Sequence, residues 1–594
     1  MNRALSFSSL AVCAALGPLA VAACSSTDRG FRVDPEEPPF VEQDSGPPPV
    51  PPACGRHCSR DLKKVLDGCE GSEKVVAECS VDQGCAIDTC VDACTAAAVN
   101  KGSPGCDFYT VPPADPSTYK GSCFAALIAN TWDRPVTLSA EFGTASLDIS
   151  RSIYTVSRKE DGEDYTLLDG ALPPGEVAVV FLSHNEASQS SQTMLCPTTV
   201  HPAMLVDPLR YGTTKTTAFR LKADAPIAAY TIYPYGGAES YYPTATLLLP
   251  VTAWNTGYIA VSPYDYGAFG KPRTLQIIAS EDDTDVSIRP TVEVAAGAGV
   301  AGATTGVTQT WKLQRGQTLQ FAQAAMTGSP IVSTKPVGVF GGSTCTFIMA
   351  QYCDLLQQQI PPFAQWGSEY ALVPFKPRLA SFSDQIREKT PYTLVGAVDG
   401  TVLTYEPSRP RNAPETLGAG EVANFITDEI VVVRSQDSKH PFYASVYMTG
   451  STYGNGEGKR TLGDPDFVNV PPADQFLDRY VFFTDYTYPE TNLTIVRRKT
   501  AKGFAPVELE CGGEVTGWRP VGSSGEYEFA WVTLTTGFVP QKLSTGTCGY
   551  GRQEAHSDGP FSITVWGTGI DASYGYVAGM GLRPINDAKV PSVN

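Results

Sequence analysis

Short runs of alternating apolar and polar residues follow one another along most of this chain. Residues 274–279 and 318–321 are typical runs, and clusters of Gly, Pro, Asp and Asn separate such runs at intervals of about 8–12 residues. A period of two is typical of a β-strand that buries one face, whereas helical periodicity is nearly absent. The pattern therefore predicts an all-β protein.

A proline, an aromatic residue and a tyrosine recur with the spacing Pro-x-x-x-aromatic-x-x-x-Tyr. The three copies are Pro250, Trp254 and Tyr258; Pro362, Trp366 and Tyr370; and Pro472, Phe476 and Tyr480. Their separation of about 110 residues indicates an internal repeat. We interpret the motif as a junction in which the proline ends one unit and the ring fills the next core, in preference to a ligand-stacking site.

Two further markers recur with a similar period. A turn Leu-x-x-Gly-Glu/Gln begins at Leu172, Leu313 and Leu417, and a proline opens an apolar strand at Pro226, Pro336, Pro441 and Pro560. The markers predict a β domain over residues 113–594 with four repeats, at 113–249, 250–361, 362–471 and 472–594. Each repeat has roughly seven or eight strand-like runs, enough for a β-sandwich. Tandem β-sandwich-like repeats are favoured over a propeller, because one propeller blade needs only ~45 residues.

The amino-terminal end has the features of an export signal. One charge at Arg3 precedes an uncharged run rich in Ala, Leu and Val, and small residues stand directly before Cys24. Residues 21–26 resemble a lipobox, so we expect residues 1–23 to be a lipoprotein signal peptide and Cys24 to carry membrane-anchoring acyl chains. The alternative is an ordinary signal peptide that is cut nearby. Residues 24–53, rich in proline and acidic residues, are expected to form an extended tether.

Eight cysteines crowd into residues 54–112, where apolar residues are few. They are Cys54, Cys58, Cys69, Cys79, Cys85, Cys90, Cys94 and Cys106. So small a segment is not stable through burial alone, and four disulfides would take the place of a core. We expect a partly helical module, with short helices indicated by Leu62, Val65 and Leu66 and by the pair Cys90 and Cys94. The alternative is a zinc site, although no Cys-x-x-Cys pair occurs.

The remaining cysteines beyond Cys24 fall into three couples that are close in sequence. They are Cys123 with Cys196, Cys345 with Cys353, and Cys511 with Cys548. An exported chain enters an oxidising compartment, so we expect each couple to form a disulfide, giving seven in all.

Several segments of the chain resemble one known family. They are residues 328–342, Cys345, Cys353-Asp354, Gln359-Ile360-Pro361-Pro362, Trp366-Gly367 and Tyr370, followed near the carboxyl end by residues 565–567, 571–576 and Gly579. Together they resemble the amino-terminal domain of IgGFc-binding proteins, over roughly residues 123–582. Members of that family are secreted or surface-attached, so the resemblance implies contact with extracellular ligands. It identifies no Fc-contacting residue in this chain.

The sequence contains no linear motif of an enzyme. HExxH, GxSxG and a complete phosphate-binding loop are all absent, and no cofactor is predicted. The five histidines are scattered along the chain, at His57, His184, His201, His440 and His556. The formal net charge of −18 excludes nucleic acid and electrostatic docking onto anionic lipid as partners.

Two surface features are candidate ligand contacts. The acidic run 281–285 has oxygen ligands suited to calcium, but a solvated turn between two strands is the favoured interpretation. The glutamine-rich segment 351–359 follows Cys345 and contains Cys353, so we expect a surface loop pinned by a disulfide.

The sequence therefore predicts a surface-anchored adhesion lipoprotein that recognises an extracellular protein or glycan through β-sandwich loops. It is expected to be a non-enzyme without bound metal, and Ser25 after Cys24 resembles the sorting signal for the outer membrane or cell surface. The alternative is a β-rich secreted hydrolase acting on polysaccharide. Such an enzyme needs two carboxylates about 5–9 Å apart in a cleft, one with a raised pKa.

Overall fold

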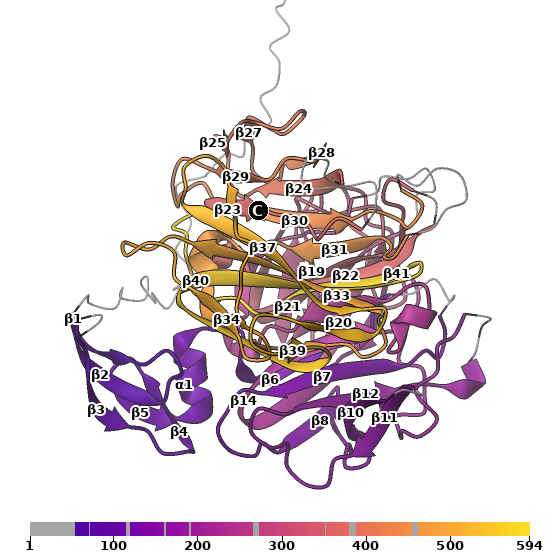
Figure 1. Cartoon of the computed structure of the whole chain (residues 1–594). Coiled ribbons are helices and arrows are strands. Elements are labelled where there is room, and N and C mark those ends of the chain that lie inside the picture. The colour runs from indigo at the N-terminus through magenta and orange to yellow at the C-terminus, as the bar shows by residue number, and fades with distance from the viewer. Residues whose placement is uncertain are drawn as a thin grey trace, which may run out of the picture. The chain divides into compact units, whose positions relative to one another are not determined.

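A computed structural model describes residues 54–69, 72–114, 119–159, 162–188, 190, 192–264, 272–350, 352–378, 388–453 and 461–593. The described chain is all-β, as predicted, with one α-helix and five short 3₁₀ helices (Figure 1). The segments expected to be a signal peptide and a tether, with Cys24 between them, lie outside the described residues.

The cysteine-rich module is mostly strand. Its three-stranded sheet contains β1 (Cys54–Cys58), β2 (Lys64–Cys69) and β3 (Lys74–Glu78), and a hairpin of β4 (Gln83–Ala86) and β5 (Thr89–Asp92) leads into α1 (Ala93–Asn100). The helix expected at Leu62, Val65 and Leu66 is wrong: residues 64–69 pair with β1 on one side and β3 on the other. Two disulfides fix β1 to β2 and to β4, and this constraint overrides the local apolar spacing.

The first repeat is built around one long strand. Its strands are β7 (Phe124–Asn130), β8 (Leu138–Phe142), β9 (Ala145–Leu147), β10 (Ile153–Lys159), β11 (Gly162–Leu167), β12 (Val177–Ser183), β14 (Phe219–Tyr233) and β15 (Thr244–Leu247), with η1 (Glu186–Ser188) and η2 (Gly237–Glu239). They are joined by β6 (Gly105–Thr110), which comes from the end of the cysteine-rich segment. One half of β14 pairs with β6 and β8, and the other half pairs with β7 and β15. This one strand therefore exchanges its pairing partners halfway along its length, within a single nine-stranded sheet.

The second repeat has the same plan. Its elements are η3 (Val251–Ala253), β16 (Asn255–Ile259), β17 (Arg273–Ala279), β18 (Thr284–Ile288), β19 (Gln309–Leu313), β20 (Gln317–Gln323), β21 (Pro330–Thr346) and β22 (Asp354–Ile360), and β13 (Thr214–Thr217) adds to the edge of β20. The first half of β21 pairs with β16 and β18, and its second half pairs with β17 and β22.

The third repeat divides the long strand in two. Its elements are η4 (Phe363–Gln365), β23 (Glu369–Leu372), β24 (Thr390–Gly396), β25 (Thr401–Val402), β26 (Thr404–Glu406), β27 (Thr416–Leu417), β28 (Val422–Thr427), β29 (Val431–Arg434), β30 (Phe442–Met448) and β31 (Asp466–Asn469). β29 pairs with β23 and β26, whereas β30 pairs with β24 and β31.

The fourth repeat restores the long strand. Its elements are η5 (Ala473–Gln475), β32 (Leu477–Thr484), β33 (Glu490–Arg498), β34 (Val507–Leu509), β35 (Gly513–Glu514), β36 (Arg519–Val521), β37 (Tyr527–Thr536), β38 (Val539–Lys542), β39 (Thr547–Cys548), β40 (Gly551–Gly569) and β41 (Ala572–Val577). β40 pairs with β32 and β34 before its middle, and with β33 and β41 after it.

The recurring prolines explain why the long strands change pairing partners. Pro226, Pro336 and Pro560 lie within β14, β21 and β40, near the point where the pairing partners change, and Pro441 lies between β29 and β30. Proline has no N–H to donate to a ladder, so it weakens pairing at that point and lets the strand exchange one set of partners for another.

The tyrosine of the recurring motif binds the chain at this same turning point. The hydroxyls of Tyr258, Tyr370 and Tyr480 donate to the carbonyls of Val337, Phe442 and Phe561, at 2.6, 2.5 and 2.5 Å. Each acceptor is the residue after a marker proline. The motif tryptophans Trp254 and Trp366 are buried, so the motif is a structural junction as interpreted.

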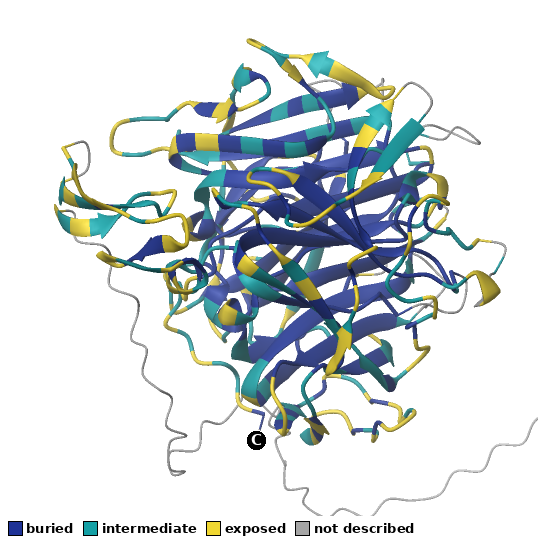
Figure 2. Cartoon of the chain, turned by 90° about the horizontal axis from the view of Figure 1, so that it is seen from below, coloured by how far each residue is buried: buried dark blue, intermediate teal, exposed yellow. Residues whose placement is uncertain are grey.

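The structure also shows how the repeats meet. The last strand of each repeat contacts the last strands of two others, in the cyclic order β15, β22, β31, β41. These four inner strands close a ring, and buried residues run through the strands of all four repeats (Figure 2). The repeats therefore share a hydrophobic core and are not separate domains.

Candidate functional site

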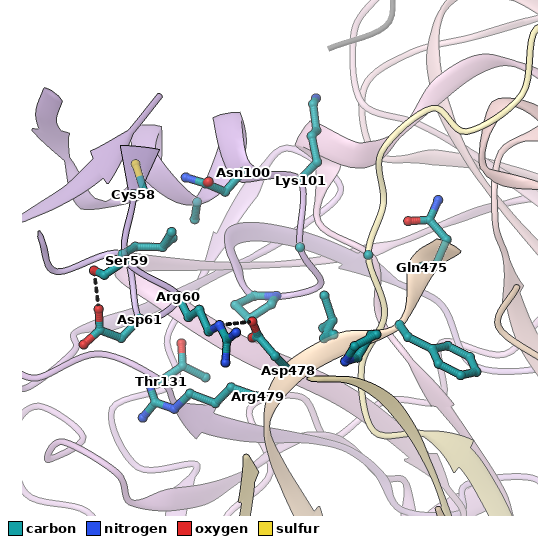
Figure 3. A pocket seen from close by; sticks show the side chains of 18 of the residues that line it. Cys58, Ser59, Arg60, Asp61, Asn100, Lys101, Thr131, Gln475, Asp478 and Arg479 are labelled. Atoms are coloured by element: carbon teal, nitrogen blue, oxygen red, sulfur yellow. Dashed lines mark hydrogen bonds and ion pairs between the residues drawn. The ribbon is translucent and has the colours of Figure 1, made fainter. Parts of the chain in front are cut away.

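A cleft of about 640 Å³ lies where the cysteine-rich module meets the fourth repeat (Figure 3). Its walls come from the turn after β1, the end of α1, the start of β32 and the middle of β40. Charged side chains of both signs line it, namely Arg60, Asp61, Lys101, Asp474, Asp478, Arg479, Asp558 and Arg583. The cleft is assembled from segments far apart in the chain.

Arg60 fixes the module to the fourth repeat along one wall of this cleft. Its Nε lies 3.1 Å from Asp478 Oδ2, and its Nη1 lies 3.0 Å from Asp558 Oδ1. Nη1 also donates to the carbonyl of Ser557 at 3.0 Å. A guanidinium with several donors in one plane suits such a multiple contact, so Arg60 holds the two walls at a set separation.

Two carboxyl groups of the cleft have opposite pKa shifts. Burial raises the pKa of Asp478, although the adjacent Arg60 guanidinium lowers it in part. Burial also raises the pKa of Asp61, but hydrogen bonds from the Ser59 hydroxyl and from the Lys63 N–H outweigh burial, so its pKa falls below the usual value. Each of these carboxyls is thus bound by groups of its own chain.

Aromatic side chains complete the walls. Trp132 is buried, its Nε1 donates to the carbonyl of Val81 at 2.8 Å, and the Lys63 ammonium lies 3.2 Å from its ring centroid. Phe476 takes the aromatic position of the recurring motif but is only partly buried, and it lines the cleft. In this one copy the predicted core residue therefore also contributes to a surface site.

The glutamine-rich segment is buried strand, so the surface loop expected at 351–359 is wrong. Gln357, Gln358 and Gln359 lie in β22, and all three are buried. Gln358 Nε2 donates to the carbonyls of Ala245 and Gly575, at 2.7 and 3.1 Å. The glutamines join the inner strands of different repeats, because amide side chains satisfy backbone groups that no sheet ladder reaches. Of the segment within the described residues, only 352 and 353 belong to the disulfide loop.

The acidic run 281–285 spans the turn between β17 and β18 and the start of β18, in agreement with the turn favoured from the sequence. Asp282 Oδ1 accepts from the N–H of Arg315 at 3.0 Å, and Asp285 pairs with Lys312 at 3.0 Å. Within the described ranges, no group of three or more His, Cys, Asp and Glu side chains is arranged to hold a metal ion.

The histidines lie on different elements and have different neighbours. His184 is buried beside the N–H of Cys196, and His440 Nδ1 lies 2.7 Å from Asp437 Oδ1. His57 Nδ1 contacts the carbonyl of Gly55, and His556 lies 3.6 Å from Glu508. His201 is exposed.

Seven disulfides occur in the described chain. They join Cys54 to Cys69, Cys58 to Cys85, Cys79 to Cys90, Cys94 to Cys106, Cys123 to Cys196, Cys345 to Cys353, and Cys511 to Cys548. The last three are the couples expected from proximity in sequence. All eight cysteines of the module are bonded, so no thiolate is left there for zinc. So many disulfides are typical of an exported protein.

Sequence reasoning missed the cleft residues Arg60, Asp478 and Phe476. No local signal marks the first two, since their pairing joins positions more than four hundred residues apart. For Phe476, the replacement of tryptophan by a smaller ring in the third motif copy was the available signal.

No helix in the described part of the chain is long and apolar enough to cross a membrane. Comparison with curated proteins and with solved structures gives no match. Residues 244–567, more than half of the chain, match the family described as IgGFc binding protein, and this match includes the segment around Cys353-Asp354 that carries the sequence resemblance. The chain therefore belongs to the IgGFc-binding protein family.

Proposed function

We propose that this protein is a surface-anchored lipoprotein that binds an extracellular protein or glycan, and that the cleft beside Arg60 is its ligand site. The observation that carries the proposal is the cleft itself: a hollow with charged and aromatic walls on a disulfide-braced β body. Ligand sites in proteins are typically hollows in which a few polar groups stand among apolar ones. Family membership supports a binding role.

The ligand test uses the mature chain with its disulfides intact. The probes are IgG Fc, because the family is described by that ligand, and an array of surface glycans. Phe476→Ala removes an aromatic wall of the cleft, and Tyr211→Ala removes a ring that is 41% exposed elsewhere as the matched control. We expect Phe476→Ala to weaken binding about 10-fold or more, as for an aromatic hot spot, and Tyr211→Ala to leave it unchanged. Equal effects of both variants would contradict the proposed site.

Anchoring is proposed separately, through acylation of Cys24. Cells fed a fatty-acid analogue are expected to label the wild-type chain but not Cys24→Ser, which is expected to leave the membrane fraction. Protease treatment of whole cells then shows whether the β body is on the outer surface. Labelling of the serine variant would exclude this anchor.

The hydrolase alternative is less well supported by the geometry of the cleft. Asp478 has the raised pKa that a general acid needs, and Asp61 has a lowered one. Both carboxyls already have partners within the chain, however, because Arg60 forms an ion pair with Asp478 and the Ser59 hydroxyl donates to Asp61 at 2.6 Å. Release of reducing sugar from bacterial or host polysaccharides, lost in Asp478→Asn, would reverse this preference.

A further inference from the structure

Four acidic side chains are buried where the inner strands of the ring begin. Asp354 and Asp464 stand eight residues before Pro362 and Pro472 of the recurring motif, Asp466 begins β31, and Asp571 directly precedes β41. Their exposed fractions are 0%, 2%, 0% and 5%. We call these four residues the axial cluster. It is separate from the cleft, because none of its members lines that site.

Contacts relate the members of the axial cluster in two pairs, Asp464 with Asp571 and Asp354 with Asp466. The N–H of Ser451 donates to Asp464 Oδ1 at 3.0 Å, and the hydroxyl of Ser451 donates to Asp571 Oδ1 at 2.6 Å. The strand that begins with Asp354 packs against the strand that begins with Asp466. The pKa of Asp354 lies well above its usual value, first through burial and then through the charges of the other three carboxyls.

Unpartnered polar atoms surround Asp354, which is a second and separate observation. Among the described residues, both carboxyl oxygens of Asp354 and Oδ2 of Asp466 have no hydrogen-bond partner, and neither have the hydroxyls of Thr346 and Tyr488. Thr346 lies directly across the β21–β22 ladder from Asp354, so the two side chains share a face. The pKa of the buried Tyr488 is raised by desolvation and by carboxyls that include Asp466 and Asp354. These neutral hydroxyls therefore face the same space as the carboxyls.

These buried carboxyls need a proton, a cation or hydrogen-bond donors beside them, since an isolated buried carboxylate is strongly unfavourable. The buried arginine of this region, Arg378, is paired with Glu388 at 2.5 Å. Almost all buried polar atoms in proteins have a partner, and an ion or water commonly supplies the missing one. The atoms named above that have no hydrogen-bond partner, on Asp354, Asp466, Thr346 and Tyr488, are all oxygens.

We propose that two members of the axial cluster, Asp354 and Asp466, bind one hard divalent cation, calcium, through their carboxylates. The other two members are not ligands, in keeping with the finding that no three acidic, histidine or cysteine side chains of the described chain are arranged to hold a metal. Oxygen-only surroundings select calcium over zinc or copper, which prefer nitrogen and sulfur. Two carboxylates hold the ion, and hydroxyl, carbonyl and water oxygens complete its shell, as calcium's flexible coordination allows. A cation here joins the second and third repeats and stabilises the closed ring.

The test uses the mature full-length chain, with Tb³⁺ as a luminescent probe and Ca²⁺ as competitor. Tyr488 lies beside the site and is expected to sensitise Tb³⁺ emission, which Ca²⁺ then displaces. Asp354→Asn is expected to weaken Tb³⁺ and Ca²⁺ binding about 10-fold or more, because ligand charge sets calcium affinity. The matched control is Asp283→Asn, in the exposed acidic turn, which is expected to change neither.

Thermal unfolding with and without Ca²⁺ separates a cation site from a merely buried charge. Without Ca²⁺ and at a pH where the Asp354 carboxyl is ionised, Asp354→Asn is expected to unfold at a higher temperature than the wild type, because it removes a buried charge. With saturating Ca²⁺, the wild type is expected to gain more than the variant, because it binds the ion more tightly. Absence of any Ca²⁺ effect on the wild type, or loss of the effect in Asp283→Asn but not in Asp354→Asn, would overturn the inference and leave water or protons as the compensation. Neither result bears on the proposed ligand cleft.

Discussion

At the scale of single residues, the tyrosine of the recurring motif makes two hydrogen bonds to the backbone of its own repeat. Tyr370 accepts from the N–H of Gly367 at 2.9 Å and donates to the carbonyl of Phe442, all within a buried junction. Tyr480 makes the same pair of bonds with Leu477 and Phe561. The hydroxyl therefore supplies hydrogen-bond partners for two backbone groups, an N–H and a carbonyl, that no sheet ladder satisfies.

Tyr370→Phe is expected to lower the free energy of unfolding by about 1–3 kcal/mol, since it leaves a buried donor and a buried acceptor without partners. Chemical denaturation with intact disulfides measures this change. Tyr241→Phe, at a tyrosine that is 49% exposed, is the control and is expected to have no effect. A similar small change in both variants would show that the hydroxyl is dispensable.

The raised pKa of Asp485 leads us to expect that the stability of the protein depends on pH. It is fully buried between the first and fourth repeats, and burial raises its pKa to about 6. The folded state therefore holds a proton that the unfolded state releases above its usual pKa near 4, so this contribution is complete at lower pH and is lost as pH rises through 6. The loss amounts to about 3 kcal/mol at most.

Asp485→Asn removes this titration. Unfolding measured between pH 4 and pH 7 is expected to show a smaller decline in stability for the variant than for the wild type, and a more stable variant at pH 7. Parallel curves for the two proteins would contradict the assignment.

At the scale of elements, the sequence predicts the strands but not their partners. Alternation and the spacing of Pro250, Pro362 and Pro472 identify strand-rich repeats, and sequence proximity identifies three disulfide couples. It does not identify β22 as a buried inner strand, because three consecutive glutamines look solvent-exposed until their partners on β15 and β41 are known. Polar residues in a core depend on such distant contacts, as do the cleft residues.

Docking of the cysteine-rich module rests on a small number of contacts and is open to test. Arg60→Ala removes the link to Asp478 and Asp558 and is expected to increase hydrogen exchange at the turn after β1 and at the start of β32. Arg56→Ala, an exposed arginine on β1, is the matched control. Unchanged exchange in Arg60→Ala would mean that the other contacts, such as Lys101 Nζ with the carbonyl of Thr252 at 2.6 Å, suffice.

At the scale of the whole β body, the first and last repeats depend on each other. The hydroxyl of Tyr230 in β14 donates to the carbonyl of Ala578 at 2.5 Å, and its ring lies 4.6 Å from that of Tyr576 in β41. Both residues are fully buried. Among the described residues, no disulfide joins the first repeat to the fourth, so packing and hydrogen bonds alone close the ring at this contact. We call the contact between these two repeats the seam.

A chain that ends at residue 471 lacks β41, the neighbour of both β15 and β31. It is expected to lose cooperative unfolding altogether, because two inner strands then expose buried faces. Thermal melts followed by circular dichroism and limited proteolysis measure this. A cooperative transition with about three quarters of the native signal would instead indicate independent repeats of the kind found in solenoids.

The closed ring also limits how such a protein can change over generations. An open solenoid grows by duplicating a repeat, since each new copy stacks on the last. Here β15 already meets β41, so a fifth copy would have no gap to enter without breaking that seam. Diversity must therefore arise in the connecting loops and in attached modules, while the number of copies stays at four.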